Sequence, residues 1–283
     1  MQLEWLSSLP VPVITLGMFA LMLLSSLGGR LAHRLPPLAR NPKSAESEGS
    51  IAHEGYALGA TLALLGLLLA FSFGMVLNRY EARRDLAINE ANAIGTAYLR
   101  AQLLDEPHRS RLGNLLVAYA DNRIVVASTG ARAGVPLTTN DRLLNEIWAA
   151  VRAAREAALA QGLTTTLLMS INEVIDLDTE RKLAWQLRLP GEVMLLLIAY
   201  VSVTSAVVGY SIDGPRGRRA AIVLFVLISL SIGIMADINR PMSGATRDPQ
   251  EPLQMLLQSL RAQRPEVFDR FAAPGESAAN QAR

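Results

Sequence analysis

The stretch GYALGATLALLGLLLAFSFGMVL, residues 55–77, carries no charge and is long enough to cross a bilayer as a helix. Three more apolar runs, at 10–27, 193–212 and 220–238, meet or approach the required length of roughly 20 residues. Asp237 is the one charged residue within these runs, and it falls in a final turn. The pattern predicts a multi-pass membrane protein with two pairs of membrane helices and a polar segment between the pairs.

The first apolar run does not read as a secretory signal. Glu4 is the only charged residue before it, so the basic segment that opens a signal peptide is missing. The run is followed by Arg30, His33 and Arg34, where a cleavage site would need small residues. We therefore interpret it as a membrane helix that starts at the Pro-Val-Pro of 10–12 and ends at Gly28 and Gly29.

Composition excludes several classes of protein. The chain is 51% hydrophobic with a mean hydropathy of +0.25, and its net charge of +2 gives no reason to expect nucleic-acid binding. Cysteine is absent and the three histidines are scattered, so we expect no thiolate or histidine metal site. A glycine-rich phosphate loop, a G-x-S-x-G motif and a metal-spaced histidine pair are all missing. We expect no enzyme activity and no cofactor.

The polar middle and the tail read as helices. No helix-breaking residue follows residue 77, so one long helix is expected over 55–104. The acids and proline at 105–107 are expected to end it and to start another helix, which ends near 128. Thr139 or Asn140 is expected to cap a helix ending at 161–162, and another is expected over 164–189, with Pro190 opening the third membrane helix. A seven-residue link at 213–219 predicts an antiparallel membrane hairpin, 253–260 is amphipathic, and the end of the tail is expected to be mobile.

The predicted fold class is all-α. The expected organisation is a first membrane helix with a basic loop (1–54), a second membrane helix continuing as a long projecting helix (55–104), a helical extramembrane domain (105–189), a membrane hairpin (190–240) and a polar tail (241–283).

Two membrane runs carry stripes of small residues at helical spacing. The first consists of Gly55, Gly59, Ala63, Gly66, Ala70 and Gly74, and the second of Ala199, Ser202, Ala206 and Gly209. Helices in lipid associate by close packing of small residues. We expect both stripes to pack on neighbouring helices or on each other.

A candidate pore face follows from spacing within the second membrane run. Leu67, Phe71 and Met75 are four residues apart and share one helix face beside the small-residue stripe. In a symmetric oligomer such rings would form an apolar constriction, which can gate by dewetting. The alternative is that the three side chains face lipid or a neighbouring helix.

Polar residues beyond this run form two further candidate sets. The juxtamembrane charged cluster could filter ions or could consist of snorkelling arginines and helical ion pairs; it comprises Asn78, Arg79, Glu81, Arg83, Arg84 and Asp85. A polar network could line a hydrated vestibule or form the wet face of a bundle; its candidates are Asn89, Glu90, Asn92, Asn172, Glu173, Asp176, Arg181, Asp237 and Arg240. Glu90 is expected to pair with Arg181 or Arg123. Asp237 is expected to pair with Arg79 or Arg83, or to coordinate an ion.

Several motifs resemble the bestrophin-like family of membrane proteins. They are NRYEARR at 78–84, EANAIGTAYLRA at 90–101, YADNR at 119–123, INEVID at 171–176, Arg181, Pro190 and DINRP at 237–241. They extend from the second membrane helix to the fourth. The more distant resemblance to bestrophins implies a pentameric ion channel with an apolar neck from the second helix and a cytoplasmic middle domain. The tryptophan expected in the run around Tyr80, Glu81 and Arg83 is missing.

Orientation and function stay open between alternatives. Lys and Arg are denser in the short loops, which favours cytoplasmic short loops, whereas the resemblance favours a cytoplasmic middle domain. The first functional hypothesis is an oligomeric channel for small monovalent ions in the cell (inner) membrane, with the bilayer, further copies of the chain and ions as partners. The alternative is a non-conducting scaffold or sensor whose helical domain binds a protein partner.

Overall fold

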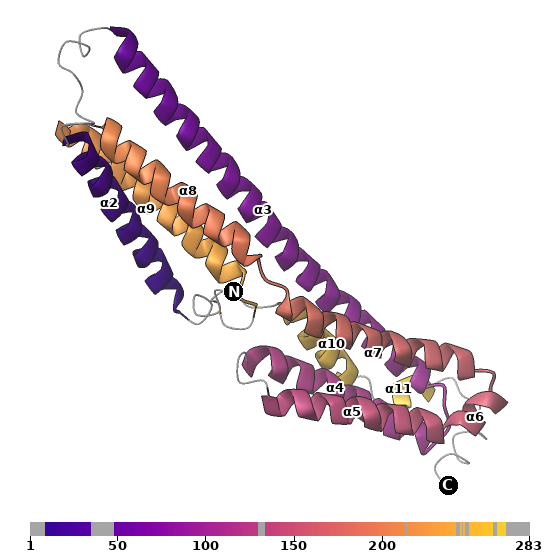
Figure 1. Cartoon of the computed structure of the whole chain (residues 1–283). Coiled ribbons are helices and arrows are strands. Elements are labelled where there is room, and N and C mark those ends of the chain that lie inside the picture. Colours follow the sequence, from indigo (N-terminus) through magenta and orange to yellow (C-terminus); the bar gives the residue numbers. More distant parts are fainter. Residues whose placement is uncertain are drawn as a thin grey trace. The chain divides into compact units, whose positions relative to one another are not determined.

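The computed structural model describes residues 9–34, 48–129, 134–212, 214–241, 244, 246, 249–262 and 265–269. Every regular element in these ranges is a helix, so the all-α prediction is confirmed (Figure 1). The helices are α2 (Val11–Arg34), α3 (Glu48–Ala101), α4 (His108–Thr129), α5 (Gly134–Ala153), α6 (Arg155–Ala160), α7 (Thr164–Gln186), α8 (Gly191–Ser211), α9 (Gly214–Ile238), α10 (Glu251–Ala262) and α11 (Pro265–Asp269).

The chain divides into two compact units. The first, called here the membrane unit, comprises Met1–Arg79, Arg188–Arg240 and Gly244–Thr246. The second, the bundle unit, comprises Tyr80–Leu187, Pro241–Ser243 and Arg247–Arg283. Helix α3 is continuous and contributes to both, as the absence of a breaker after residue 77 predicts.

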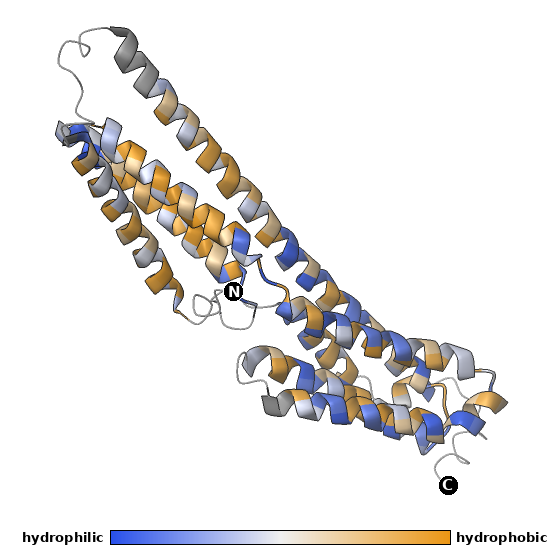
Figure 2. Cartoon of the chain, in the orientation of Figure 1, coloured by the Kyte–Doolittle hydropathy of each residue, from blue (hydrophilic) through white to orange (hydrophobic). Residues whose placement is uncertain are grey.

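Four helical segments are long and apolar enough to cross a membrane, as the sequence predicts. They lie within Val11–His33, Gly55–Ala101, Thr164–Ser211 and Gly214–Ile238. Figure 2 shows hydrophobic colouring along most of α8 and α9 and along the part of α3 that belongs to the membrane unit. Further along α3 the colouring becomes hydrophilic. The protein is therefore an integral membrane protein, with the apolar part of α3 as its second span.

Glycines bring the backbone of α2 against that of α8 and let a side chain of α2 approach α9 closely. A Cβ at Gly209 would lie 2.0 Å from the carbonyl oxygen of Ser26, and a Cβ at Gly29 would lie 2.0 Å from that of Ala206. At Gly233 on α9, a Cβ would meet the hydroxyl of Thr15 at 2.1 Å. Ala206 and Gly209 of α8 therefore pack on α2, which is the close approach expected of small residues in lipid, whereas Ala199 of the same predicted stripe is exposed.

The expectation that Gly28 and Gly29 end the first membrane helix is wrong. Helix α2 continues to Arg34, and Gly29 lies inside it. The reason is the contact with Ala206: the missing side chain serves helix packing, and no left-handed terminating residue is formed there, since the positive-φ glycines among the described residues are Gly162 and Gly214. Of the loop expected after Arg30, residues 35–47 lie outside the described residues.

The bundle unit packs around one apolar core. Its fully buried members include Ile94 on α3, Leu116 on α4, Ile147 on α5 and Ile171 on α7. On α10 the three buried leucines, at 253, 257 and 260, join the same core, which confirms the amphipathic pattern of the tail. The final stretch expected to be mobile, 270–283, lies outside the described residues.

The third helix of the polar middle differs from its prediction. Helix α5 begins at Gly134, before Thr139 and Asn140, and a break at Ala154 separates it from α6. Asn140 is fully buried inside α5, and its amide donates to Asp178 on α7 at 2.9 Å. Its side chain therefore serves a contact between helices and does not cap a helix.

Candidate functional site

The apolar part of α3 has one face packed on the membrane unit. Leu65 and Val76 are 1% exposed and Ser72 is fully buried, and the two apolar side chains belong to the core cluster that includes Leu197 of α8 and Phe225 of α9. These three α3 positions lie on one side of the helix because they are separated by seven and four residues. This side fixes the helix to its own subunit.

The opposite face of α3 is open. Leu67, Phe71 and Met75, the predicted pore-lining residues, are 53%, 65% and 38% exposed. Beside them, a Cβ at Gly59, Gly66 or Gly74 would have no atom within 4 Å, and Gly55 is equally open. The small-residue stripe of α3 thus packs on nothing in the described part of this subunit, whereas Gly29, Gly209 and Gly233 each contact a neighbouring helix. Gly17 and Gly28 of α2 are open as well.

The predicted juxtamembrane cluster does not form one site. Asn78, Glu81, Arg84 and Asp85 are exposed, and within the described residues Glu81 forms no ion pair with Arg84. Arg83 is 3% exposed, and its guanidinium lies 6.0 Å from the centre of the Tyr80 ring. Arg79 donates a hydrogen bond to the backbone carbonyl of Arg188.

Asp237 is buried at the end of α9 and closes a turn. Its carboxylate accepts the backbone N–H of Thr246 at 2.8 Å, and a Cβ at Gly244 would lie 2.9 Å from the same carboxylate. Arg240 donates to the backbone carbonyl of Leu9. The guanidinium of Arg79 is directed to the carbonyl of Arg188, and the expected pair of Asp237 with Arg79 or Arg83 stays a prediction.

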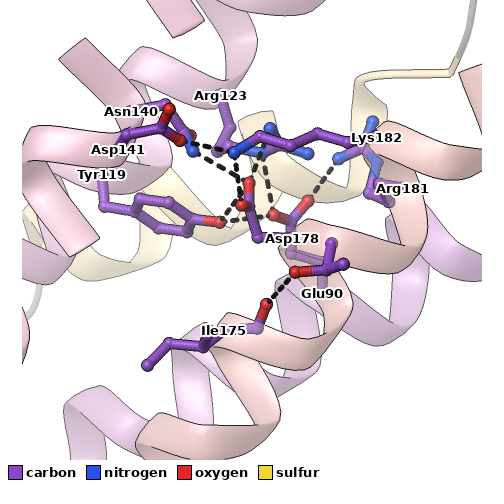
Figure 3. Close-up of polar contacts among 10 residues, drawn as sticks. Glu90, Tyr119, Arg123, Asn140, Asp141, Ile175, Asp178, Arg181 and Lys182 are labelled. Atoms are coloured by element: carbon purple, nitrogen blue, oxygen red, sulfur yellow. Dashed lines mark hydrogen bonds and ion pairs between the residues drawn. The ribbon is translucent and has the colours of Figure 1, made fainter. Parts of the chain in front are cut away.

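In the bundle unit, Glu90 of α3 lies between two buried arginines (Figure 3). One carboxylate oxygen is 2.8 Å from Nε of Arg123 on α4, and the other accepts from Arg181 on α7. All three side chains are 1% exposed or less. The expected pairing of Glu90 with Arg181 or Arg123 thus occurs with both.

A second carboxylate, Asp178 of α7, completes the network. It lies 3.1 Å from Nη1 of Arg123 and 2.7 Å from Nζ of Lys182, and it accepts the amide of Asn140 at 2.9 Å. The hydroxyl of Tyr119 donates to Glu90 at 2.8 Å. Lys182 also contacts Asp141 at 2.6 Å, so three carboxylates balance two guanidinium groups and one ammonium group. The cluster therefore joins α3, α4, α5 and α7 without a net internal charge.

The network determines the protonation of its members. Burial by itself raises the pKa of Glu90, but Arg123 and Arg181 and the hydrogen bonds from Arg181 and Tyr119 outweigh it and hold that pKa below its usual value. Burial raises the pKa of Tyr119 well above its usual value, and the charge of Glu90 raises it further. Glu90 is therefore ionised and Tyr119 neutral at pH 7.

Trp185 closes the network on one side. Its ring lies 4.9 Å from the guanidinium carbon of Arg123 and 5.3 Å from that of Arg181, and the side chain is 7% exposed. Both contacts are cation–π interactions, which gain strength when they are shielded from water. The arrangement joins helices and shields Glu90, Arg123 and Arg181 from water.

Sequence reasoning selected only part of this network. Asn89, Asn92, Asn172, Glu173 and Asp176 are exposed and take no part in it. Tyr119, Asn140, Asp178 and Lys182 were missed as members.

Helical spacing places some of the missed residues on the same helix face as an arginine of the network. Tyr119 lies four residues before Arg123, and Asp178 lies three before Arg181, so each pair shares a helix face. In the described part of the chain, no three His, Asp or Glu side chains gather as metal ligands.

The comparisons with known proteins assign the family. A family model described as the Bestrophin-like domain matches residues 19–253, and the chain belongs to this family. No curated protein matches the sequence.

Solved structures share the fold at low sequence identity. A crystal structure of a bacterial bestrophin homologue from Klebsiella pneumoniae is 17% identical with a TM-score of 0.60, covering 88% of this chain and 99% of that one. A variant of that homologue is 17% identical with a TM-score of 0.62, covering 89% and 97%. A second variant is 15% identical with a TM-score of 0.61, covering 87% and 98%.

Proposed function

We propose that the protein is one subunit of an oligomeric ion channel in the cell (inner) membrane. In this proposal the open face of α3 lines the pore, and small monovalent ions pass along it. Membership of the Bestrophin-like family and the fold shared with bestrophin homologues support the proposal. The observation that carries it is that the glycine stripe of α3 is open along its length, whereas Gly29, Gly209 and Gly233 are packed against neighbouring helices.

Glycine in a membrane helix serves close packing, because apolar side chains gain little by leaving lipid tails for one another. Gly29, Gly209 and Gly233 are each in contact with a neighbouring helix of this subunit. Gly66 and Gly74 have open space where a side chain would be. A second copy of the chain packed on that stripe would give these glycines the same role and would direct the adjacent face towards a common axis.

The side chains on that adjacent face suit a gate. Leu67, Phe71 and Met75 are spaced by one helical turn or slightly more, so related copies would form successive apolar rings about 6 Å apart. A narrow apolar constriction excludes water and ions until it widens. Phe71, at 65% exposed, is the bulkiest and most exposed of the three.

The test is single-channel recording from the purified full-length protein in planar bilayers. We expect Phe71→Ala to raise the open probability or the conductance, because the widest side chain leaves the constriction. Leu24→Ala is the matched control, since Leu24 on α2 is 66% exposed and faces away from the core of the subunit. Identical currents from both variants, or silent bilayers for the assembled wild-type protein, would contradict the proposal.

A further inference from the structure

Three arginines from separate segments lie near one another at one end of the membrane unit. Arg79 follows the apolar part of α3, and Arg240 follows α9. Arg188 lies in the short segment that joins α7 to α8. Arg79 donates to the backbone carbonyl of Arg188. The next residue, Leu189, donates its N–H to the side-chain oxygen of Asn239 at 2.9 Å. This hydrogen bond brings the segment between α7 and α8 beside Arg240.

Within the described residues, neither Arg79 nor Arg188 forms an ion pair with an acid. Arg188 is exposed, and within the described residues its guanidinium has no hydrogen-bonding or ionic partner. Arg79 bonds to a neutral carbonyl, not to an acid. Asp237, the buried acid nearby, already accepts the N–H of Thr246.

The lowered pKa of Arg240 reflects the positive charge of its neighbour Arg188. Burial lowers the pKa of Arg240, the charge of Arg188 lowers it further, and Asp237 compensates only in part. An anion held between these arginines would relieve that repulsion.

The cluster lies where the apolar segments end. The uncharged run of α3 stops at residue 77, α8 starts at Gly191 and α9 ends at Ile238. This is the level of the lipid headgroups, where long basic side chains extend out of the hydrocarbon to reach polar groups. Guanidinium groups bind phosphate oxygens in a bidentate manner, so arginine suits this ligand better than lysine does.

We propose that Arg79, Arg188 and Arg240 form a binding site for the phosphate group of an anionic phospholipid headgroup. The site needs neither a pore nor a particular ion, so it is independent of the proposed channel function. Its chemistry would also suit free phosphate, but the ends of three apolar segments favour a ligand that is anchored in the bilayer. Basic side chains near the membrane surface attract anionic lipids even before any specific hydrogen bond forms.

The test is native mass spectrometry of the full-length protein titrated with phosphatidylglycerol, phosphatidylcholine or inorganic phosphate. The variant is Arg188→Gln, which changes an exposed side chain and keeps the backbone carbonyl that Arg79 uses. Arg216→Gln is the control, because Arg216 is an exposed arginine near the start of α9, at the opposite end of that helix.

We expect phosphatidylglycerol to bind more tightly than phosphatidylcholine. Arg188→Gln should weaken the binding of phosphatidylglycerol roughly tenfold, the loss expected for one charged hydrogen bond, while Arg216→Gln should leave it within about twofold. Displacement of phosphatidylglycerol by inorganic phosphate from the wild type would support the phosphate site and show that soluble anions can enter it. Equal losses in the two variants, or equal affinity for the two lipids, would overturn the proposal.

Discussion

The replacement Glu90→Gln should destabilise the bundle unit strongly. Glu90 is fully buried and contacts Arg123 at 2.8 Å, Arg181 and the hydroxyl of Tyr119. Glutamine has nearly the same shape, so the change removes one charge without opening a cavity. Arg123 and Arg181 then both lose the negative charge of Glu90, and Asp178, which contacts Arg123, is already in contact with Lys182.

The magnitude follows from the burial of both partners. Removing one member of a buried ion pair costs about 3–5 kcal/mol, mainly because the remaining charge is left without compensation. Hydrogen bonding of the new amide with Tyr119 recovers part of this, so we expect a loss of about 3 kcal/mol. For a chain of this size, that corresponds to a drop in Tm of about 6–12 °C.

The assay is thermal unfolding of the full-length protein in detergent, followed by circular dichroism. Asp85→Asn is the matched control, because it removes a carboxylate charge from an exposed position on the same helix. The control should melt within about 2 °C of the wild type, since exposed substitutions usually change stability by less than about 0.5 kcal/mol. A Glu90→Gln protein that melts together with the control would refute the claim that the network stabilises the bundle unit.

The same pair of proteins gives a pH test. The pKa of Glu90 is lowered in the folded state, so its ionisation stabilises the fold fully above the unfolded value near 4.5. That stability is lost as the pH falls further, through the lower folded pKa. The difference in Tm between wild type and Glu90→Gln should therefore be constant around neutral pH and shrink in acid.

Two further contrasts test packing. Gly209→Ala should lower the yield and Tm of the folded protein, because its Cβ would lie 2.0 Å from the carbonyl oxygen of Ser26. Gly66→Ala, where a Cβ meets open space, should leave the subunit fold intact and reduce only the oligomer fraction measured by light scattering. Leu257→Ala should cost about 2–4 kcal/mol by emptying a buried position of α10, while Met255→Ala, at 70% exposed, should be near neutral in the same melting assay.

Hydropathy and the lack of breakers were enough to predict most of the fold. Four apolar runs gave the membrane helices, and the unbroken run after residue 77 gave the continuity of α3. Gly29 shows why the helix end was misplaced: a glycine that ends a helix and a glycine that admits a neighbouring backbone look alike in a sequence. Only the position of Ala206 distinguishes them.

The site was less predictable because its members come from different helices. Glu90 and Arg181 were selected, yet Asn140 was taken for a cap because asparagine favours that position in general. Its burial against Asp178 depends on how α5 and α7 pack, which no local pattern contains. The exposed Asn89 and Asn92 were included because a polar stripe looks the same whether it faces water or a pore.

The most direct test of the central claim is a cryo-EM reconstruction of the full-length protein in lipid nanodiscs. The account predicts a closed ring in which the glycine stripe of α3 packs on the adjacent copy and Leu67, Phe71 and Met75 face the symmetry axis. A monomer, or an assembly in which this face of α3 contacts lipid, would contradict it.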